Sequence, residues 1–459
     1  MIPIVEFEER SKNGPSMDKE EFDNLVMDTA MEVVEERDLE FDQSAIIQDD
    51  ETADAVFAAA MDFLEAVGLY NMGTHRVIKW TRDEIADLVD DYKNNPRSMT
   101  LGEGAEQFTV AARSEGDPNP PIIWAAGGPL ADISQIEPCI MAYKDEHYVK
   151  GLLKTSDAPA VDGIVSQAGT ATEIYCTTRC VAAQTAALEK AGRVGLFRGN
   201  ANPTNLGAVL AATGPGMFEP GSFMMGVHIA PEMQLDGSRL STALACELLG
   251  IEPWISAMSM MGGLCGGPEG AAIGAVANAL AQMSYAHGKW TSIGTTDMQG
   301  AHKDWRTLAA ESTAHKAIVR NLRIPTSSVC VESGMVCCHE EAIITGVMVA
   351  MMLTTSGGAI DWFTGTSPLT ARLHHDVMTN VATMRRDEMN ELLNRVLEKK
   401  AEIVAAHEGE QLPFPLQLFG NIYDLQTVRP KPEYVAAVQR SIDALRECGV
   451  PVSEGLSLD

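Results

Sequence analysis

From about residue 161 onward the sequence alternates between short apolar runs and longer segments with a helical period, and few folds accommodate that alternation. The runs rich in Val, Ile and Phe predict strands at 161–167, 193–198, 222–229, 253–258, 290–295, 327–332 and 359–363. Segments rich in Ala and Leu predict helices between them, for example at 173–190, 270–287 and 340–355. Strand and helix repeated in this order are typical of a parallel α/β fold.

A closed TIM (β/α)₈ barrel fits this spacing better than an open sheet, because no Gly-x-Gly-x-x-Gly follows the first predicted strand. The pattern leaves one of the eight strands unassigned. We expect residues 1–150 to form an acidic N-terminal helical extension packed as a cap on the barrel, and 151–459 to form the barrel. Within the extension, Thr81-Arg-Asp-Glu84 fits the capping box of a helix start.

Charge and cysteine content exclude several classes of protein. The net charge is −30, and residues 1–66 hold 20 acidic against 4 basic side chains. Such a surface repels nucleic acid and anionic membranes, so neither is an expected partner. The longest apolar stretch, 342–353, is shorter than the ~18 residues that span a bilayer. No signal peptide is recognisable, and nine scattered cysteines indicate free thiols, so a cytoplasmic location is expected.

Catalytic residues of a TIM barrel lie where its strands end and in the loops that follow. The predicted strand ends supply Gln167, Arg198, Asn200, His228, Ser256, Thr296, Asp297, Glu332 and Asp361.

Most of these residues also have a structural interpretation. Arg198 can clamp a carboxylate with two parallel hydrogen bonds, or form a structural ion pair. His228 fits an acid or base, or a core histidine. Glu332 follows a strand and precedes a turn, as a catalytic carboxylate would. Asp297 is favoured as the cap of the next helix.

Two motifs suggest other chemistry, and we favour a structural interpretation of both. Cys337-Cys338-His339-Glu340, together with Cys330, raises the possibility of zinc. Adjacent cysteines rarely bind one ion and no second Cys-x-x-Cys exists, so we expect no metal site. The glycine loop at 262–267 lacks the Lys and Ser/Thr of a phosphate-binding loop. It is better explained as a tight turn with a helix starting at Pro268.

Several segments in order resemble one family over nearly the whole chain. They include Thr74-His-Arg-Val-Ile-Lys79, Thr81-Arg-Asp-Glu-Ile85, Gly127-Gly-Pro129, the glycine loop and Tyr423-Asp-x-x-Thr-Val-x-Pro. Their order and spacing are similar to those of the monomethylamine:corrinoid methyltransferases. The resemblance implies a TIM barrel that transfers a methyl group from a methylated amine to Co(I) of a separate corrinoid protein. It also implies a homo-oligomer and no tightly bound cofactor.

In that family a pyrrolysine holds methylamine, and its position falls on Arg198 or Gly199 here. This sequence contains no pyrrolysine. We therefore expect a quaternary amine or a betaine as the substrate rather than monomethylamine. Arg198 would orient it, and Glu332 and Asn200 would polarise it. The expected binding residues are Gln167, Phe197, Trp254, Ser256, Thr296, Asp297 and Cys330, with Phe197, Trp254 or Trp362 as an aromatic wall for the ammonium.

Two other functions stay open on the sequence. One is a metal-dependent TIM-barrel lyase or hydrolase that uses Cys330, Glu332, Cys338 and His339. The other is a non-catalytic paralogue that binds a corrinoid protein, which the absence of the family's pocket carboxylates favours.

Overall fold

A closed parallel barrel forms the centre of the computed structural model, which describes residues 2–125, 130, 132–153, 159–199, 206–213, 220–298, 303–330, 336–363, 367–407, 410 and 419–458. Around the barrel the strands are β5 (Ile122–Ala125), β6 (Val149–Leu153), β9 (Phe197–Gly199), β10 (Phe223–Gly226), β12 (Glu252–Trp254) with β13 (Ser256–Met261), β14 (Thr291–Asp297), β15 (Thr326–Cys330) and β16 (Ile360–Phe363). Every neighbouring pair is parallel, and β16 pairs with β5.

The barrel closes at Ile255, the single residue between β12 and β13. β12 pairs with β10, and β13 pairs with β14, so one length of chain contacts both neighbours in turn. The interruption has a local cause, because Gln282 of the helix behind binds both backbone groups of Ser256. Its Oε1 accepts from Ser256 N at 3.1 Å, and its Nε2 donates to Ser256 O at 2.8 Å. If β12 and β13 are counted as one interrupted strand, the described residues form an eight-stranded barrel.

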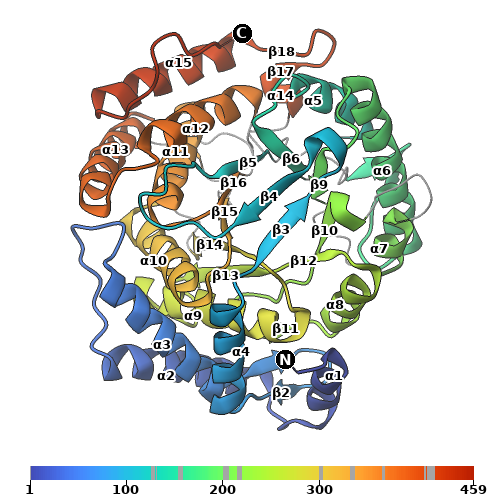
Figure 1. Ribbon diagram of the computed structural model, residues 1–459, viewed down its shortest axis with the longest axis vertical. Coiled ribbons are helices and arrows are strands. Elements are labelled where there is room, and N and C mark those ends of the chain that lie inside the picture. Colours follow the sequence, from blue (N-terminus) through green and yellow to red (C-terminus); the bar gives the residue numbers. More distant parts are fainter. Residues whose placement is uncertain are drawn as a thin grey trace.

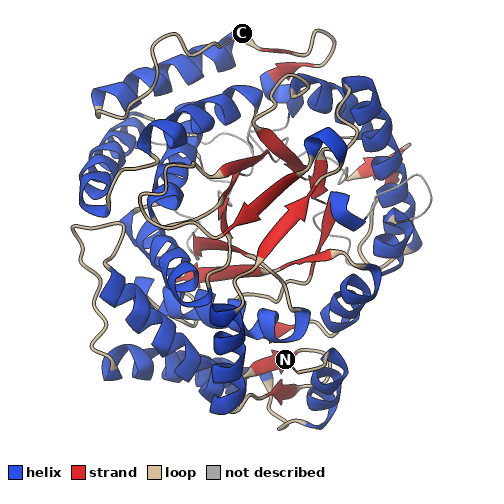
Figure 2. Ribbon diagram, viewed as in Figure 1, coloured by secondary structure: helices blue, strands red, loops and turns tan. Residues whose placement is uncertain are grey.

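A helix follows each strand and the helices form an outer ring (Figures 1 and 2). In chain order they are α5 (Ile136–Ala142), α6 (Ala171–Ala191), α7 (Leu206–Ala212), α8 (Ser238–Leu249), α9 (Pro268–Ala286), α10 (Trp305–Leu322), α11 (His339–Thr355) and α12 (Pro368–Val381). Outside α11 and α12 lie α13 (Arg386–Ala406) and α15 (Pro432–Glu447). The predicted TIM barrel is confirmed.

The first two strands differ from the sequence prediction. β5 and β6 both begin before residue 151, where we expected the barrel to start. The predicted strand at 161–167 is instead a small antiparallel hairpin outside the barrel, formed by β7 (Ala160–Val161) and β8 (Ile164–Val165). An apolar run of this length does not show by itself which sheet it joins.

Large aromatic side chains fill the barrel. Alternate residues of each strand point inward, and they bring Trp124, Phe197, Trp254 and Trp362 into one buried cluster with Trp290. Gly151 makes room for them, since a Cβ there would lie 2.9 Å from ring atoms of both Phe197 and Trp124.

A hairpin covers the amino end of the barrel. It consists of β3 (Ser98–Leu101) and β4 (Phe108–Ala111), and it crosses the centre of the view in Figure 1. Its side chains Met99, Leu101 and Val110 pack into the same aromatic cluster. The lumen is therefore closed at this end by apolar packing.

The N-terminal extension packs along one side of the helix ring. It comprises α1 (Ile4–Asn13), α2 (Lys19–Glu36), α3 (Asp50–Val67) and α4 (Arg82–Asn94), with α3 against α9 and α10. The predicted capping box at Thr81 is confirmed at the start of α4. The extension also reaches a barrel loop, because β1 (Leu69–Asn71) pairs with β11 (Gln234–Leu235), which follows β10.

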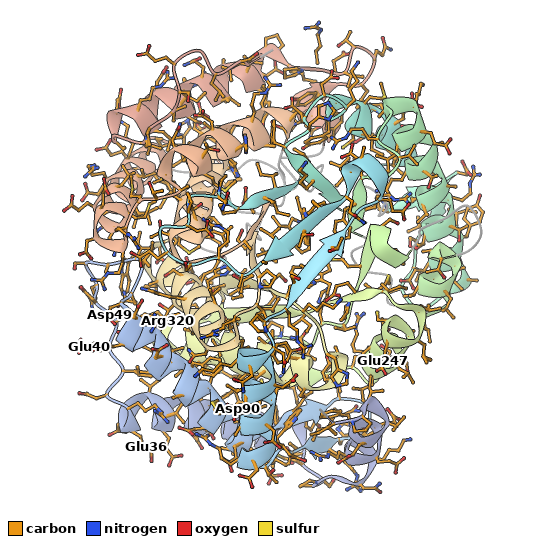
Figure 3. All side chains as sticks on the ribbon, viewed as in Figure 1. Glu36, Glu40, Asp49, Asp90, Glu247 and Arg320 are labelled. Carbon is orange, nitrogen blue, oxygen red and sulfur yellow. The ribbon has the colours of Figure 1, made fainter. Side chains whose placement is uncertain are left out.

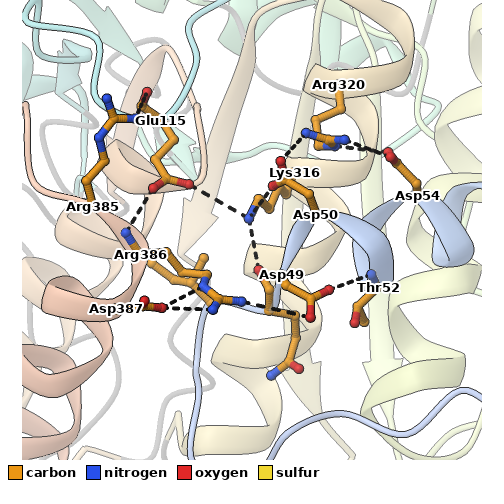
Figure 4. A network of polar contacts seen from close by, with 12 residues as sticks. Asp49, Asp50, Thr52, Asp54, Glu115, Lys316, Arg320, Arg385, Arg386 and Asp387 are labelled. Atoms are coloured by element: carbon orange, nitrogen blue, oxygen red, sulfur yellow. Dashed lines mark hydrogen bonds and ion pairs between the residues drawn. The ribbon is translucent and has the colours of Figure 1, made fainter.

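Ion pairs join the extension to α10 (Figure 4). Asp50 Oδ1 lies 2.7 Å from Lys316 Nζ, and Asp54 Oδ2 lies 2.7 Å from Arg320 Nη2. Acidic side chains without such roles face solvent, among them Glu36, Glu40, Asp90 and Glu247 (Figure 3). In the part of the chain that the structure describes, no helix is both long and apolar enough to cross a membrane.

Candidate active site

Three rings meet in the lumen towards the carboxyl ends of the strands. Trp254 ends β12, Trp362 lies in β16, and His228 follows β10. The Trp254 and Trp362 centroids are 4.3 Å apart, and the Trp254 and His228 centroids are 4.1 Å apart. Trp254 Nε1 donates to Ser292 Oγ at 2.7 Å, which fixes the orientation of the indole. We call Trp254, Trp362 and His228 the aromatic cluster of the mouth.

Phe197 belongs to a different layer. Its ring lies 4.9 Å from that of Trp124 and 6.3 Å from that of Phe108 in the hairpin that closes the amino end. Trp124 in turn meets Trp290 at 5.1 Å. Phe197 is fully buried, so its ring serves the packed lower core. Of the three aromatic residues proposed from the sequence as a wall, Trp254 and Trp362 come together.

Arg198 does not face the lumen as expected. Phe197 occupies the inward position on β9, so its neighbour Arg198 turns towards the helices. Its Nη1 donates to Thr185 Oγ1 of α6 at 2.8 Å, and its Nη2 donates to Ser222 Oγ at 3.3 Å. The side chain is 5% exposed. The expected clamp on a substrate carboxylate is therefore wrong in geometry, because the guanidinium lies behind the barrel wall.

Asp361 also points outward, next to the inward Trp362. Its Oδ2 lies 2.8 Å from His374 Nδ1 on α12, and both side chains are buried. The acid thus joins a strand to its helix and does not reach the mouth.

Residues on β13 and β14 divide between the two faces. Met258 and Gly294 face the lumen. Because side chains alternate along a strand, Ser256 and Thr296, each two residues away, face the lumen too. Asp297 lies 3.4 Å from Arg306 of α10. It does not cap that helix as favoured from the sequence, because Asp304 does.

Of the remaining candidates, Gln167 lies within the described residues and away from the aromatic cluster. Gln167 is exposed in the turn before α6, where its backbone N–H donates to Thr172 Oγ1. Asn200, Glu332 and the side chain of Cys330 lie outside the described residues.

The backbone of the glycine loop binds a carboxyl group of the same chain, that of Glu232. Glu232, in the segment after β10, accepts from Leu264 N at 2.5 Å. Burial raises the pKa of the Glu232 carboxyl, and the backbone N–H groups of Leu264 and Cys265 oppose that shift. A Cβ on Gly263 would overlap Glu232 Oε1. The loop is therefore a structural turn, and α9 starts at Pro268 as predicted.

A cavity of about 950 Å³ lies at the amino end of the barrel, beside the hairpin that closes the lumen. Its lining includes Arg323, Thr355 and Ser356, which precede β15 and β16, and Arg113 and Arg385. Because active sites of TIM barrels lie at the carboxyl ends of the strands, this cavity is not the candidate site.

Comparisons with known proteins agree with the fold and identify a family. A family model described as "Monomethylamine methyltransferase MtmB" matches residues 2–450. The monomethylamine methyltransferase MtmB of Methanosarcina mazei is 24% identical over 97% of each chain, and MtmB1 of Methanosarcina barkeri is 25% identical over the same shares. The crystal structure of M. barkeri MtmB superposes with a TM-score of 0.87 over 98% of each chain, at 22% identity. A crystal structure of a hydroxylamine MtmB complex gives the same values.

Proposed function

We propose, because this chain belongs to the monomethylamine methyltransferase MtmB family, that it transfers a methyl group from a methylated amine to a corrinoid carried by a separate protein. The partner's Co(I) would supply the nucleophile that accepts the methyl group. This chain would bind the amine, orient its methyl group towards the mouth and exclude water around it. The hairpin closes the amino end, so we expect the partner to dock at the carboxyl end.

The substrate we propose is a quaternary methylammonium. A primary amine is a poor leaving group unless it is first activated, and the sequence has no pyrrolysine to do so. A quaternary nitrogen already carries the charge that makes it leave. The observation that carries the proposal is the pair of indoles, Trp254 and Trp362, beside His228. Indole faces attract methylated ammonium ions by about 0.5–2 kcal/mol each.

A carboxylate on the substrate has no support from Arg198, whose guanidinium binds Thr185 and Ser222. We therefore do not require a betaine. The ring of His228 lies 4.1 Å from that of Trp254, and we assign His228 the role of orienting the ammonium group.

The test is the conversion of Co(I) to methyl-Co(III), followed by absorbance, with mono-, di-, tri- and tetramethylated amines as the methyl donors. We expect turnover with the more methylated amines and little or none with monomethylamine. Preference for monomethylamine would contradict the substrate assignment but leave the methyl transfer intact. No turnover with any donor, under conditions where a known family member is active, would contradict the enzymatic function itself.

A further inference from the structure

Two cysteines and a histidine from different helices converge beside the barrel. Cys337 and Cys338 directly precede α11, and His407 follows the last residue of α13. One potential ligand atom from each of the three residues lies within 4.8 Å of the other two. Cys337 and Cys338 are 5% and 6% exposed, and His407 is half-buried. The group is therefore largely shielded from solvent.

The distance between the sulfurs suits a single tetrahedral ion. Cys337 Sγ and Cys338 Sγ are 3.7 Å apart. Zinc–sulfur bonds of about 2.3 Å at a tetrahedral angle place two sulfurs about 3.8 Å apart. Adjacent cysteines rarely reach this arrangement, which is why the sequence argued against a metal. Here the extended backbone of Cys338, with φ −153° and ψ 167°, accompanies it.

A backbone hydrogen bond orients the third ligand. His407 Nδ1 lies 2.9 Å from the carbonyl oxygen of Ile403. A carbonyl oxygen can only accept, so Nδ1 carries a hydrogen, and Nε2 is the ring nitrogen left to bind a metal. Histidine ligands of metals commonly donate their other N–H to a backbone carbonyl in this way.

Two further features fix the backbone that carries the two sulfurs. Cys338 is the N-cap of α11, a helix of 17 residues. Cys337 N also donates to Glu341 Oε2 at 2.8 Å, which fixes the backbone that carries the first sulfur. His339, which the sequence suggested as a ligand, instead lies against the ring of Tyr434 at 5.5 Å.

We propose that Cys337, Cys338 and His407 form a zinc site that joins the start of α11 to the end of α13. Zinc accepts this mixture of two sulfurs and one nitrogen, and three protein ligands leave a fourth position for water or another small ligand. Because α11 follows β15, the site lies on the same side of the barrel as the candidate active site. The proposal does not depend on the reaction, since its tests measure bound metal and not activity.

The first test is the zinc content of the purified full-length chain after growth with zinc and dialysis against a weak chelator. We expect about one zinc ion per chain, and about a tenfold loss in Cys338→Ser and in His407→Gln. Cys448→Ser is the matched control, because Cys448 is also a buried thiol but lies at the end of α15. It should retain the zinc of the wild type.

The second test protects the conclusion against a variant that fails to fold. Cobalt(II) added to the metal-free wild-type chain should give an intense sulfur-to-cobalt charge-transfer band, and His407→Gln, with an unchanged circular dichroism spectrum, should weaken it. Absence of both stoichiometric zinc and this band in the wild type would overturn the proposal. Equal zinc content in all four proteins would overturn it too, since the metal would then be bound elsewhere.

Discussion

The indole of Trp254 and the imidazole of His228 meet edge to face, with their ring planes at 82° and their centroids 4.1 Å apart. They come from neighbouring strands, because Trp254 pairs with Gly226 of β10, two residues before His228. The contact therefore depends on barrel closure at β12. A polar ring is thus held beside a pair of indoles.

Replacement of Trp254 should impair binding more than turnover. We expect Trp254→Leu to raise KM for the preferred methylammonium about 2- to 30-fold, which corresponds to 0.5–2 kcal/mol, and to change kcat little. Trp290→Leu is the control, because it removes the same volume from the lower layer of the lumen. Steady-state kinetics of both variants decide the matter. An equal increase in KM in both would mean that packing, and not contact with the cation, is responsible.

Replacement of Arg198 should affect stability and leave substrate binding unchanged. The guanidinium donates to Thr185 and Ser222 in a buried position, so Arg198→Met removes both of these hydrogen bonds. We expect a loss of about 1–3 kcal/mol in the free energy of unfolding, measured by denaturant titration. KM for every active donor should stay within about twofold of the wild type. If KM rose for carboxylated donors alone, the original clamp hypothesis would be restored.

Acid should weaken the fold through His315. This side chain is fully buried on α10, with Nδ1 2.9 Å from Thr326 Oγ1, and burial lowers its pKa to about 3, with a smaller effect of Lys303. Below the usual pKa of about 6.5 the unfolded chain takes up a proton that the folded chain does not. The stability that neutral His315 contributes is thus complete above about 6.5 and is lost as the pH falls towards 3.

His315→Gln should therefore flatten the fall in unfolding free energy between about pH 6.5 and about pH 3. The same change at the exposed His147 should leave the wild-type slope. Parallel pH profiles for wild type and His315→Gln would show that other groups control the acid sensitivity.

Periodicity in the sequence predicted the barrel but not its first two strands. The central strands were recognisable because buried parallel strands are continuous apolar runs bounded by helices. β5 has four residues after two prolines, and the pattern of so short a run resembles an extended loop. The hairpin at 161–167 shows the reverse error, since strand character does not indicate which sheet a segment joins.

The sequence named two members of the aromatic cluster on different grounds. His228 was predicted as a strand end and Trp254 as part of an aromatic wall, and their rings lie 4.1 Å apart in the structure. Arg198 and Asp361 were misassigned because each is adjacent to an inward aromatic residue, and a shift of one residue along a strand changes the face. His407 gave no signal, since its relation to Cys338 exists only after α13 packs on α11.

The last prediction concerns the contact between Glu232 and Gly263, which joins the segment after β10 to the loop after β13. Glu232 has φ of 67°, a backbone conformation that residues other than glycine seldom adopt, so the surrounding contacts must impose it. Gly263→Ala would bring a Cβ against the Glu232 carboxylate and also 2.9 Å from Met260 O. We expect Gly263→Ala to lower the free energy of unfolding by about 1–3 kcal/mol.

A double-mutant cycle separates the two clashes. Glu232→Ala removes the carboxylate, so if that group causes most of the strain, adding Gly263→Ala to the Glu232→Ala chain should cost clearly less than adding it to the wild type. We expect a coupling energy of about 0.5–3 kcal/mol, as for residues in direct contact. Gly266→Ala in both backgrounds is the control, because its added Cβ would meet no atom within 4 Å, and its effect comes from its own φ of 75°. Strict additivity of Gly263→Ala and Glu232→Ala would mean that Met260 O alone excludes a side chain at this position, and that the carboxylate could move aside.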